Sequence, residues 1–341
     1  MNSRRDVLKQ SAIAAGFAGL VQAQAPAGGQ GRGGRGGGQA QAPQSVTPEN
    51  IVNAKPIWEK LYPGWKNQRI KTSGAEINAV IGGSGPPLLM FHGAPQSLIT
   101  WRLIAADLAK EYTVVLADLR GYGDSSKPSG AADHSTYSKR AMALDGVEVM
   151  KSLGYNQFRM VGHDRGGRVG RRMAIDHPDK VQKLAVLDIV PAHYLYSHVT
   201  VDFVRAYFHW FNYLRAEPGP ENELKAQNDA QAARVTDEIQ IEYLRNTTKY
   251  EMLHAMCEDY RASASLDLKI DETDIKAGKK IQCPLHVLWA ATGSMGQLYD
   301  VLGIWQSEGV KVTGKGLPGN HSLQESAPKE TLAELQQFLR G

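Results

Sequence analysis

The chain has 341 residues, of which 42% are hydrophobic and 22% are charged. A chain of this length and composition can bury a large core, and the proportions are ordinary for a globular enzyme. The formal net charge is only +4 at pH 7, so charge gives no reason to expect nucleic acid or another polyanion as partner. We therefore expect one main domain with an insertion, acting on a small molecule.

The first 25 residues have the pattern of a twin-arginine export signal. Arg4-Arg5 precedes an apolar stretch from Ala12 to Val21, and a small-x-small cleavage site follows at residues 23–25. The apolar stretch is too short to span a bilayer. We predict a cleaved signal, no membrane anchor and a periplasmic or secreted mature protein. Residues 26–48, rich in Gly, Gln, Ala and Pro, are predicted to form a disordered linker.

The chain contains only two cysteines, Cys257 and Cys283. An oxidising destination would allow them to pair, but a chain of this length does not need a disulfide. We favour two free buried thiols. Because no Cys-x-x-Cys or His-Glu-x-x-His motif occurs, we do not expect a metal enzyme.

From residue 87 onward, short apolar runs alternate with helical patterns. The predicted strands are Pro87 to Phe91, Thr113 to Ala117, Phe158 to Val161, Leu184 to Leu187, Leu285 to Trp289 and Val310 to Thr313. The predicted helices are an amphipathic stretch around Trp101 to Ala109, Lys139 to Leu153, the segment that ends at His177, and Thr331 to Leu339. This order predicts an α/β fold with a doubly wound, mostly parallel sheet.

Residues 193–265 show helical periodicity without a strand pattern. We interpret this segment as a helical cap inserted over the carboxyl edge of the sheet, where ligands of such folds bind. The core domain is then expected in two parts, residues 49–192 and residues 266–341.

The segment from Val161 to Arg168 has the form of a nucleophile elbow, a sharp turn between a strand and a helix that presents a reactive side chain. Asp164 stands where a hydrolase usually carries serine. A carboxylate attacks a saturated carbon, expels a leaving group and leaves an ester that water must cleave. The N-terminus of the following helix favours its ionised form. The alternative is that Asp164 only caps this helix.

Cleavage of the ester needs a base, and His321 lies on a Gly-containing loop between the last strand and the last helix. There it would take a proton from water, while a carboxylate holds the ring in its working tautomer. We assign that carboxylate to Asp188, at the end of an apolar strand, where an unpaired acid is costly to bury. A salt bridge elsewhere is the alternative role for Asp188.

Two arginines follow the predicted nucleophile closely. Arg165 is adjacent to it, and Arg168 lies four positions on, so it shares a helix face with Asp164. Guanidinium groups bind carboxylates in bidentate fashion, which predicts an acidic substrate. Arg171 and Arg172 on the same helix are expected to be solvated and without a role.

From about residue 65 to the end, the sequence resembles the fluoroacetate dehalogenases, a haloacetate dehalogenase family of the α/β-hydrolase superfamily. The motifs that carry the resemblance are His92-Gly93 with Pro95-Gln96, residues 118–123, 163–168 and 185–189, Phe208-His209-Trp210, and residues 257–261. The resemblance implies an α/β-hydrolase fold, a homodimer, Asp164 as nucleophile, His321 as base, Asp188 as acid, and Arg165 with Arg168 as a carboxylate clamp.

The resemblance also implies that His209, Trp210 and Tyr260 of the cap hold the departing halide. Imidazole, indole and phenol each offer a hydrogen-bond donor, although Trp210 would also suit packing of the cap onto the core. Ala94 and Ser322 stand where the family usually has aromatic residues. This difference predicts a roomier pocket and a preference for larger 2-haloacids.

The leading hypothesis is a hydrolytic dehalogenase that converts short 2-haloacids to 2-hydroxyacids and halide without a cofactor. An epoxide hydrolase uses the same nucleophile but needs two cap tyrosines, here Tyr260 with Tyr207, Tyr213 or Tyr243. With a neutral epoxide as substrate, Arg165 and Arg168 would have no anion to bind. A third hypothesis is a periplasmic protein that binds a small carboxylate without turnover.

Overall fold

The structure is a computed structural model and describes residues 48–341. The predicted signal and all but the last residue of the predicted linker lie outside these residues. The strands are β1 (Lys66–Lys71), β2 (Glu76–Gly83), β3 (Pro87–Phe91), β4 (Thr113–Ala117), β5 (Phe158–His163), β6 (Val181–Leu187), β7 (Leu285–Ala290) and β8 (Val312–Leu317).

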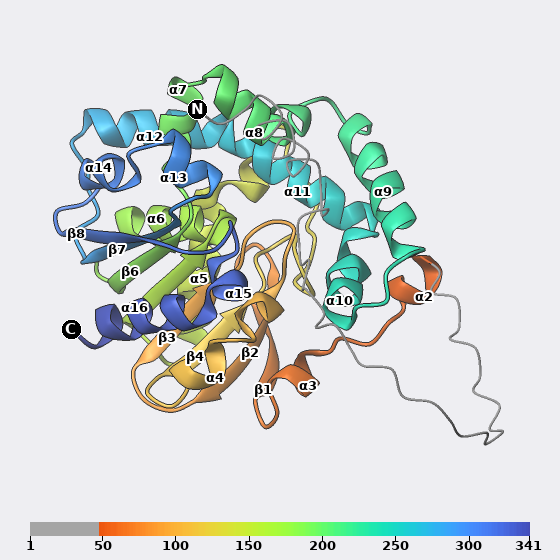
Figure 1. Ribbon diagram of the computed structural model, residues 1–341, viewed down its shortest axis with the longest axis horizontal. Helices are drawn as coiled ribbons and strands as arrows, with labels where there is room; N and C mark the ends of the chain where they lie inside the picture. The colour runs from red at the N-terminus through yellow and green to blue at the C-terminus, as the bar shows by residue number, and fades with distance from the viewer. Residues whose placement is uncertain (1–47) are drawn as a thin grey trace, which may run out of the picture.

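These strands form one eight-stranded sheet in the order β1-β2-β4-β3-β5-β6-β7-β8. The pairings of β1 with β2 and of β2 with β4 are antiparallel, and all the others are parallel. The predicted doubly wound, mostly parallel sheet is therefore confirmed (Figure 1).

Side chains of the central strands alternate between two hydrophobic cores, one on each face of the sheet. In β3, Leu89 and Phe91 join the core beneath α5 (Lys139–Ser152) and α6 (Arg165–Asp176), whereas Leu88 and Met90 join the opposite core. The second core also holds residues of α4 (Ala105–Leu108) and α16 (Pro328–Arg340). Full burial of each such side chain contributes about 1.5–3 kcal/mol.

Three of the local predictions need correction. Strands β1 and β2 were not predicted: β1 is a polar edge strand in which Ile70 is the only buried residue, and the short apolar run of β2 ends at Gly82-Gly83. Strand β8 begins at Val312 rather than Val310, whose side chain is 58% exposed. The stretch from Trp101 to Ala109 is not one helix but the end of a short 3-10 helix (Leu98–Trp101) followed by α4.

Between β6 and β7 the chain forms six helices joined by loops, with one isolated β-bridge at Ile281. Its helices are α7 (Ala192–Ser197), α8 (Val201–Asn212), α9 (Gly219–Ala232), α10 (Glu238–Thr247), α11 (Tyr250–Ser263) and α12 (Leu266–Lys276). Side-chain caps help to start two of them, since Thr200 accepts a hydrogen bond from the Phe203 N–H and Asp237 accepts one from the Gln240 N–H. Figure 1 shows α8, α9 and α11 grouped on one side of the sheet.

Shorter helices complete the described chain. They are α2 (Pro48–Val52), α3 (Trp58–Leu61), a 3-10 helix (Ser135–Tyr137), α13 (Ser294–Leu298), α14 (Val301–Gln306) and α15 (Leu323–Ser326). Within residues 48–341, no helix has both the length and the apolar character needed to cross a bilayer. Both cysteines are free, with Cys257 buried and Cys283 only partly buried.

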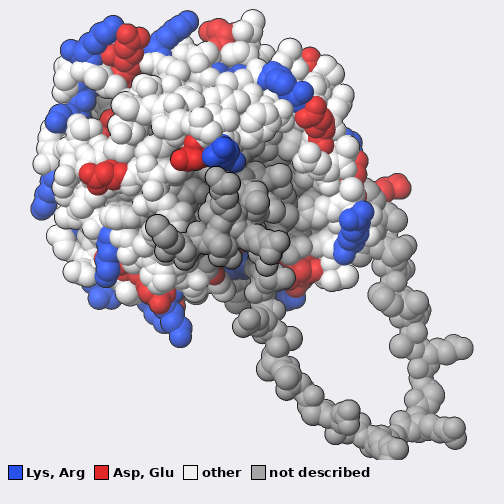
Figure 2. All heavy atoms as spheres, turned by 45° about the horizontal axis from the view of Figure 1, so that its top comes forward, with Lys and Arg blue, Asp and Glu red and all other residues white. Residues whose placement is uncertain are grey.

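Charged side chains are mixed on the face that Figure 2 draws. Lys and Arg are scattered among Asp, Glu and uncharged residues, without one large area of either sign.

Candidate active site

Asp164 lies in the sharp turn between β5 and α6, which confirms the predicted strand-turn-helix context. Its backbone has φ 42° and ψ −113°, a conformation that costs a non-glycine residue about 1–3 kcal/mol. The turn closes only around small neighbours, because a Cβ on Gly162 would lie 2.5 Å from the backbone of Gly166. A Cβ on Gly93 would lie 2.7 Å from that of Asp164.

The Asp164 carboxylate does not cap the helix. It makes no capping hydrogen bond to α6; instead, its Oδ2 accepts a hydrogen bond of 3.2 Å from the Ala94 N–H. Burial alone would raise the pKa of Asp164, but the positive charges of His321 and Arg168 outweigh it and lower this pKa to about 2. Asp164 is therefore ionised at neutral pH, with Oδ1 free of any such bond among residues 48–341.

His321 and Asp188 meet as the sequence predicts. Asp188 follows β6 directly and is 1% exposed, while the His321 side chain is 44% exposed on the loop after β8. His321 Nδ1 lies 2.6 Å from Asp188 Oδ2, and the Ala290 N–H donates to Asp188 Oδ1 at 2.8 Å. This contact fixes the proton on Nδ1 and leaves Nε2 as the basic nitrogen.

The ion pair also sets the basicity of the imidazole. Partial desolvation acts to lower the pKa of His321, but the hydrogen bond and charge of Asp188, with the charge of Asp164, raise it above its ordinary value.

Two further polar residues, His163 and Gln96, hold the His321 loop. His163 Nε2 is 2.8 Å from the carbonyl oxygen of His321, and its Nδ1 is 3.1 Å from Gln96 Oε1. Gln96 Nε2 donates to the Ser322 hydroxyl at 3.1 Å. Sequence reasoning assigned His163 and Gln96 no role, although both lie in the motifs that carry the family resemblance. Burial lowers the pKa of His163 to about 3, so this ring is neutral.

Arg165 is completely buried and already bonded within the chain. Its Nε and Nη2 bind the two carboxylate oxygens of Asp259 at 2.8 and 2.6 Å, and Nη2 also donates to the Ser263 hydroxyl. Asp259 also accepts a hydrogen bond from Tyr122 and forms an ion pair with Lys139. Of the Arg165 guanidinium nitrogens, only Nη1 is without a partner within residues 48–341. The sequence did not point to Asp259 as the support of Arg165.

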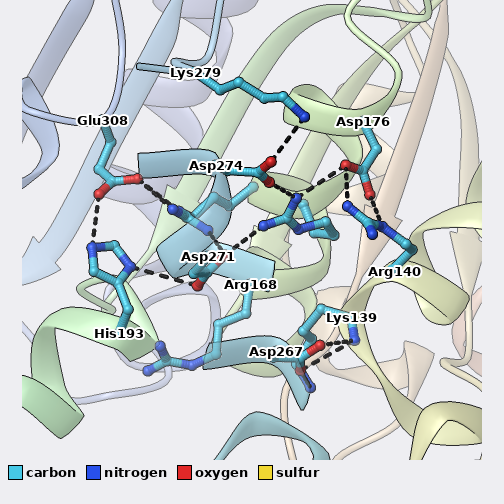
Figure 3. Close-up of polar contacts among 12 residues, drawn as sticks. Lys139, Arg140, Arg168, Asp176, His193, Asp267, Asp271, Asp274, Lys279 and Glu308 are labelled. Carbon is cyan, nitrogen blue, oxygen red and sulfur yellow. Dashed lines mark hydrogen bonds and ion pairs between the residues drawn. The ribbon is translucent and has the colours of Figure 1, made fainter. Parts of the chain in front are cut away.

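Arg168 is also buried, but no carboxylate of residues 48–341 neutralises it. Its Nη1 donates to the Val190 carbonyl at 2.8 Å, and its Nε has no partner in the part of the chain that the structure describes. No carboxylate of residues 48–341 lies within ion-pair distance of it, and Figure 3 draws no contact to it. Burial, joined by the charge of Arg165, lowers the pKa of Arg168 to about 10, while Asp164 acts in the opposite direction.

The expectation that Arg171 and Arg172 are solvated was wrong. Both are buried and ion-paired with acidic residues, and Figure 3 labels these partners, Asp176, Asp271, Asp274 and Glu308. Arg171 contacts Asp271 and Glu308, each at 2.7 Å. Arg172 contacts Asp176, Asp271 and Asp274. The sequence places both arginines on one helix. It does not reveal that acidic residues of α12 contact them.

The three predicted halide-binding side chains come together. His209 and Trp210 lie on α8, just after a break in the helical backbone at Tyr207, and Tyr260 lies on α11. The ring centroid of Tyr260 is 6.1 Å from that of His209 and 5.7 Å from that of Trp210. Burial lowers the pKa of His209 to about 4, so this imidazole is also neutral.

The aromatic rings lie against the two arginines. The Arg168 guanidinium is 4.7 Å from the Trp210 ring centroid, and that of Arg165 is 4.1 Å from the Tyr260 centroid. Neither the Trp210 N–H nor the Tyr260 hydroxyl has a hydrogen-bond partner among residues 48–341. Both donors are therefore available to a ligand.

Of the three tyrosines considered as partners of Tyr260, Tyr207 has the clearest link to the nucleophile. Burial raises the pKa of Tyr207, and the charges of Asp188 and Asp164 raise it further. Tyr213 packs beside Tyr260, with the ring centroids 5.1 Å apart. Tyr243 instead donates to Glu325 at 2.8 Å.

The site is suited to displacement by a carboxylate. The site combines an ionised aspartate, a base oriented by a second aspartate, a guanidinium without a carboxylate partner among residues 48–341, and aromatic donors. Within residues 48–341, no group of three or more His, Cys, Asp or Glu side chains has an arrangement that could hold a metal ion.

Known proteins resemble this chain in sequence. Residues 86–252 match the alpha/beta hydrolase fold family. A fluoroacetate dehalogenase from Burkholderia sp. is 41% identical over 291 residues, which cover 82% of this chain and 95% of the relative. A soluble epoxide hydrolase from Corynebacterium sp. (strain C12) is 43% identical over 119 residues, which cover 35% of this chain and 40% of that protein.

Solved structures resemble it in fold as well. A structure from Nostoc sp. PCC 7120, assigned to the α/β hydrolases, has a TM-score of 0.77 and 44% sequence identity, covering 81% of this chain and 98% of that one. The chain belongs to the haloacetate dehalogenase-like family of the α/β-hydrolase superfamily.

Proposed function

We propose that the protein is a hydrolytic dehalogenase of short 2-haloacids, with Asp164 as nucleophile, His321 as base and Asp188 as the orienting acid. The observation that carries this proposal is Arg168, a buried cation without an anionic partner in the described chain, whose charge acts on the ionised Asp164. Burying such a charge is costly unless an anion compensates it. A substrate carboxylate supplies that anion and brings the carbon beside it to Asp164.

The first step is displacement at the halogen-bearing carbon. Asp164 Oδ2 is held by the Ala94 N–H, so Oδ1 attacks. The Oδ1–carbon bond forms as the carbon–halogen bond breaks, and the halide leaves with the bonding electron pair. Attack from the side opposite to the halide inverts the carbon, so one enantiomer of 2-chloropropionate would give lactate of inverted configuration.

The halide leaves toward His209, Trp210 and Tyr260. The guanidinium groups lie 4.7 Å from the Trp210 ring and 4.1 Å from the Tyr260 ring. A cation over an aromatic ring draws electron density from it, which makes the indole N–H and the phenol O–H stronger donors. Fluoride, the most basic halide, gains most from this arrangement.

The second step cleaves the ester. His321 Nε2 takes a proton from water as the water oxygen attacks the Asp164 carboxyl carbon. Negative charge develops on Oδ2, where the Ala94 N–H already donates. As this intermediate collapses, the bond between the Asp164 carboxyl carbon and Oδ1 breaks, and His321 returns its proton to the departing Oδ1. The 2-hydroxyacid leaves with that oxygen, and Asp164 keeps one water oxygen and loses its remaining proton to solvent.

Halide release from fluoro-, chloro- and bromoacetate tests the proposal, with chloroacetamide as the matched neutral compound. We expect turnover of the acids and little turnover of the amide, because only a carboxylate compensates Arg168. Equal rates for chloroacetate and chloroacetamide would refute the carboxylate clamp. A well-folded sample that releases no halide from any haloacid would refute the function.

Epoxide hydrolysis is the second candidate. It is favoured by Tyr260 and Tyr207, because the charge of Asp164 acts on the pKa of both hydroxyls. Two such phenols would protonate the oxygen of an opening epoxide. The buried, unneutralised Arg168 argues against a neutral substrate. Diol formation from styrene oxide faster than haloacetate turnover would reverse the ranking.

A further inference from the structure

Tyr196, near the end of α7, has a buried hydroxyl without a hydrogen-bond partner in the part of the chain that the structure describes. A buried hydroxyl is unfavourable unless another polar group bonds to it. Sequence analysis gave Tyr196 no role, and the proposed mechanism does not use it.

The position of Tyr196 indicates which residues its hydroxyl acts with. Its ring lies against Trp210, with the centroids 5.4 Å apart. The guanidinium groups of Arg168 and Arg165 lie 4.7 and 5.8 Å from the same indole ring. Burial raises the pKa of Tyr196 to about 12, and the charges of both arginines act to lower it. The hydroxyl therefore lies within electrostatic reach of both arginines.

Three unpaired donors thus surround Trp210. They are Arg165 Nη1, Arg168 Nε and the Tyr196 hydroxyl, each buried and without a partner among residues 48–341. Arg168 also lines a cavity of about 20 Å³, room for one water molecule, but neither Arg165 nor Tyr196 lines it. A small group with several acceptor atoms and a negative charge matches this set of donors.

We propose that the Tyr196 hydroxyl donates a hydrogen bond to the substrate carboxylate, as a third donor beside Arg165 and Arg168. This inference rests on the proposed function and adds a residue that determines its specificity. A carboxylate offers two acceptor oxygens and no donor. A carboxamide would turn an N–H toward at least one of these donors, so Tyr196 helps to select acids.

The test compares Tyr196→Phe with Tyr299→Phe. Both changes remove one buried, unpaired hydroxyl and keep the ring. Burial raises the pKa of Tyr299 to about 12 as well, but neither arginine is among the groups that shift it. Its ring packs on Tyr194 and Phe203, with centroids 6.1 and 6.4 Å away. Tyr299→Phe is therefore a matched control for loss of a hydroxyl.

For Tyr196→Phe we expect KM for chloroacetate to rise about 10- to 100-fold, as for loss of a hydrogen bond to a charged group, with kcat changed less than threefold. Tyr299→Phe should leave both constants within about twofold. Thermal unfolding should show the same or a higher Tm for Tyr196→Phe, because the change removes an unpaired polar group. A Tyr196→Phe protein with unchanged KM, or one altered only in Tm, overturns the inference.

Binding of glycolate, a small acid that needs no turnover, separates this inference from the proposed function. Calorimetry should show weaker glycolate binding to Tyr196→Phe than to the wild type or Tyr299→Phe, and this result supports the inference even without dehalogenation. If the wild type releases halide but Tyr196→Phe binds glycolate normally, the Tyr196 assignment alone is wrong. If the wild type neither binds glycolate nor releases halide, the proposed function is wrong and the inference falls with it.

Discussion

Neighbouring turns of helix α6 carry the same residue type in opposite electrostatic settings. Arg171 and Arg172, in the middle of the helix, each contact at least two carboxylates. Arg168, near its start, is just as buried but has no carboxylate partner in residues 48–341. Burial alone therefore does not separate a structural arginine from one that is available to a ligand; the difference lies in whether the chain neutralises the charge.

The pKa shifts follow the same division. Burial acts to lower the pKa of all three arginines. The carboxylates of Asp271 and Glu308 outweigh this effect at Arg171, whose pKa is raised, whereas the pKa of Arg168 falls to about 10. The buried charge of Arg168 is thus not compensated by an ion pair within residues 48–341. Binding of an anion would stabilise it.

The largest expected effect is at Asp164, whose pKa the charge of Arg168 helps to lower. Asp164→Asn should lower haloacetate turnover at least about 10⁴-fold, because a neutral amide is a poor nucleophile. Its unfolding midpoint should stay close to that of the wild type. Intact mass must be checked after the assay, since hydrolysis of the new amide would restore aspartate. Residual activity near the wild-type level in a sample of correct mass would exclude Asp164 as nucleophile.

Arg172→Met tests whether the ion-paired arginines of α6 stabilise the fold rather than bind the substrate. It leaves Asp271 and Asp274 without one of their cations, and breaking a buried pair in this way costs about 3–5 kcal/mol of stability. Urea unfolding measures this loss. At low temperature the folded protein should keep its kcat/KM within a few-fold. A large loss of kcat/KM without destabilisation would mean that Arg172 serves the substrate.

Arg168→Met should have the reverse signature. KM for chloroacetate is expected to rise on the order of 100-fold, whereas stability should be unchanged or higher because the variant buries no unpaired cation. Steady-state kinetics and urea unfolding on the same preparation test both statements. If Arg168→Met is as destabilised as Arg172→Met, the division between Arg168 and the ion-paired Arg171 and Arg172 is wrong.

Trp210→Phe tests whether the indole over Arg168 binds halide or only packs the cap. The change keeps a ring but removes the N–H. We expect roughly 100-fold slower release of fluoride, equivalent to about 3 kcal/mol, and a smaller loss for bromoacetate. An equal loss for both substrates would favour the packing role.

The smallest effect concerns pH. His321 must be neutral to act as base, and its pKa is raised above the ordinary value of 6.5. Turnover should therefore rise with pH through a pKa above 6.5 and fall about tenfold per pH unit below it. Asp188→Asn should move this limb to lower pH and reduce the plateau.

For stability the sign is opposite: the His321–Asp188 pair stabilises the fold below pH 6.5 and loses this contribution as pH rises through the folded pKa of His321.

The sequence was sufficient for features that depend on local pattern and chain order. The apolar runs located β3 and β4, and the elbow with the later His321 and the strand-end Asp188 predicted a triad whose members the structure brings together. Two kinds of feature were missed. Strands β1 and β2 were not predicted, and β1 is a polar edge strand without an apolar pattern. Asp259, which binds Arg165, and Asp271 and Asp274, which bind Arg172, lie 94 to 102 positions away, and no local periodicity reveals contacts at such separations.

The most direct test of the account is one turnover of chloroacetate in oxygen-18 water with enzyme in excess, followed by mass analysis of the peptide that contains Asp164. The account predicts that the label enters the Asp164 carboxylate and that the first glycolate released carries oxygen from the protein. Label in the glycolate, with an unlabelled Asp164 peptide, would show that water attacks the substrate directly and would contradict the ester intermediate.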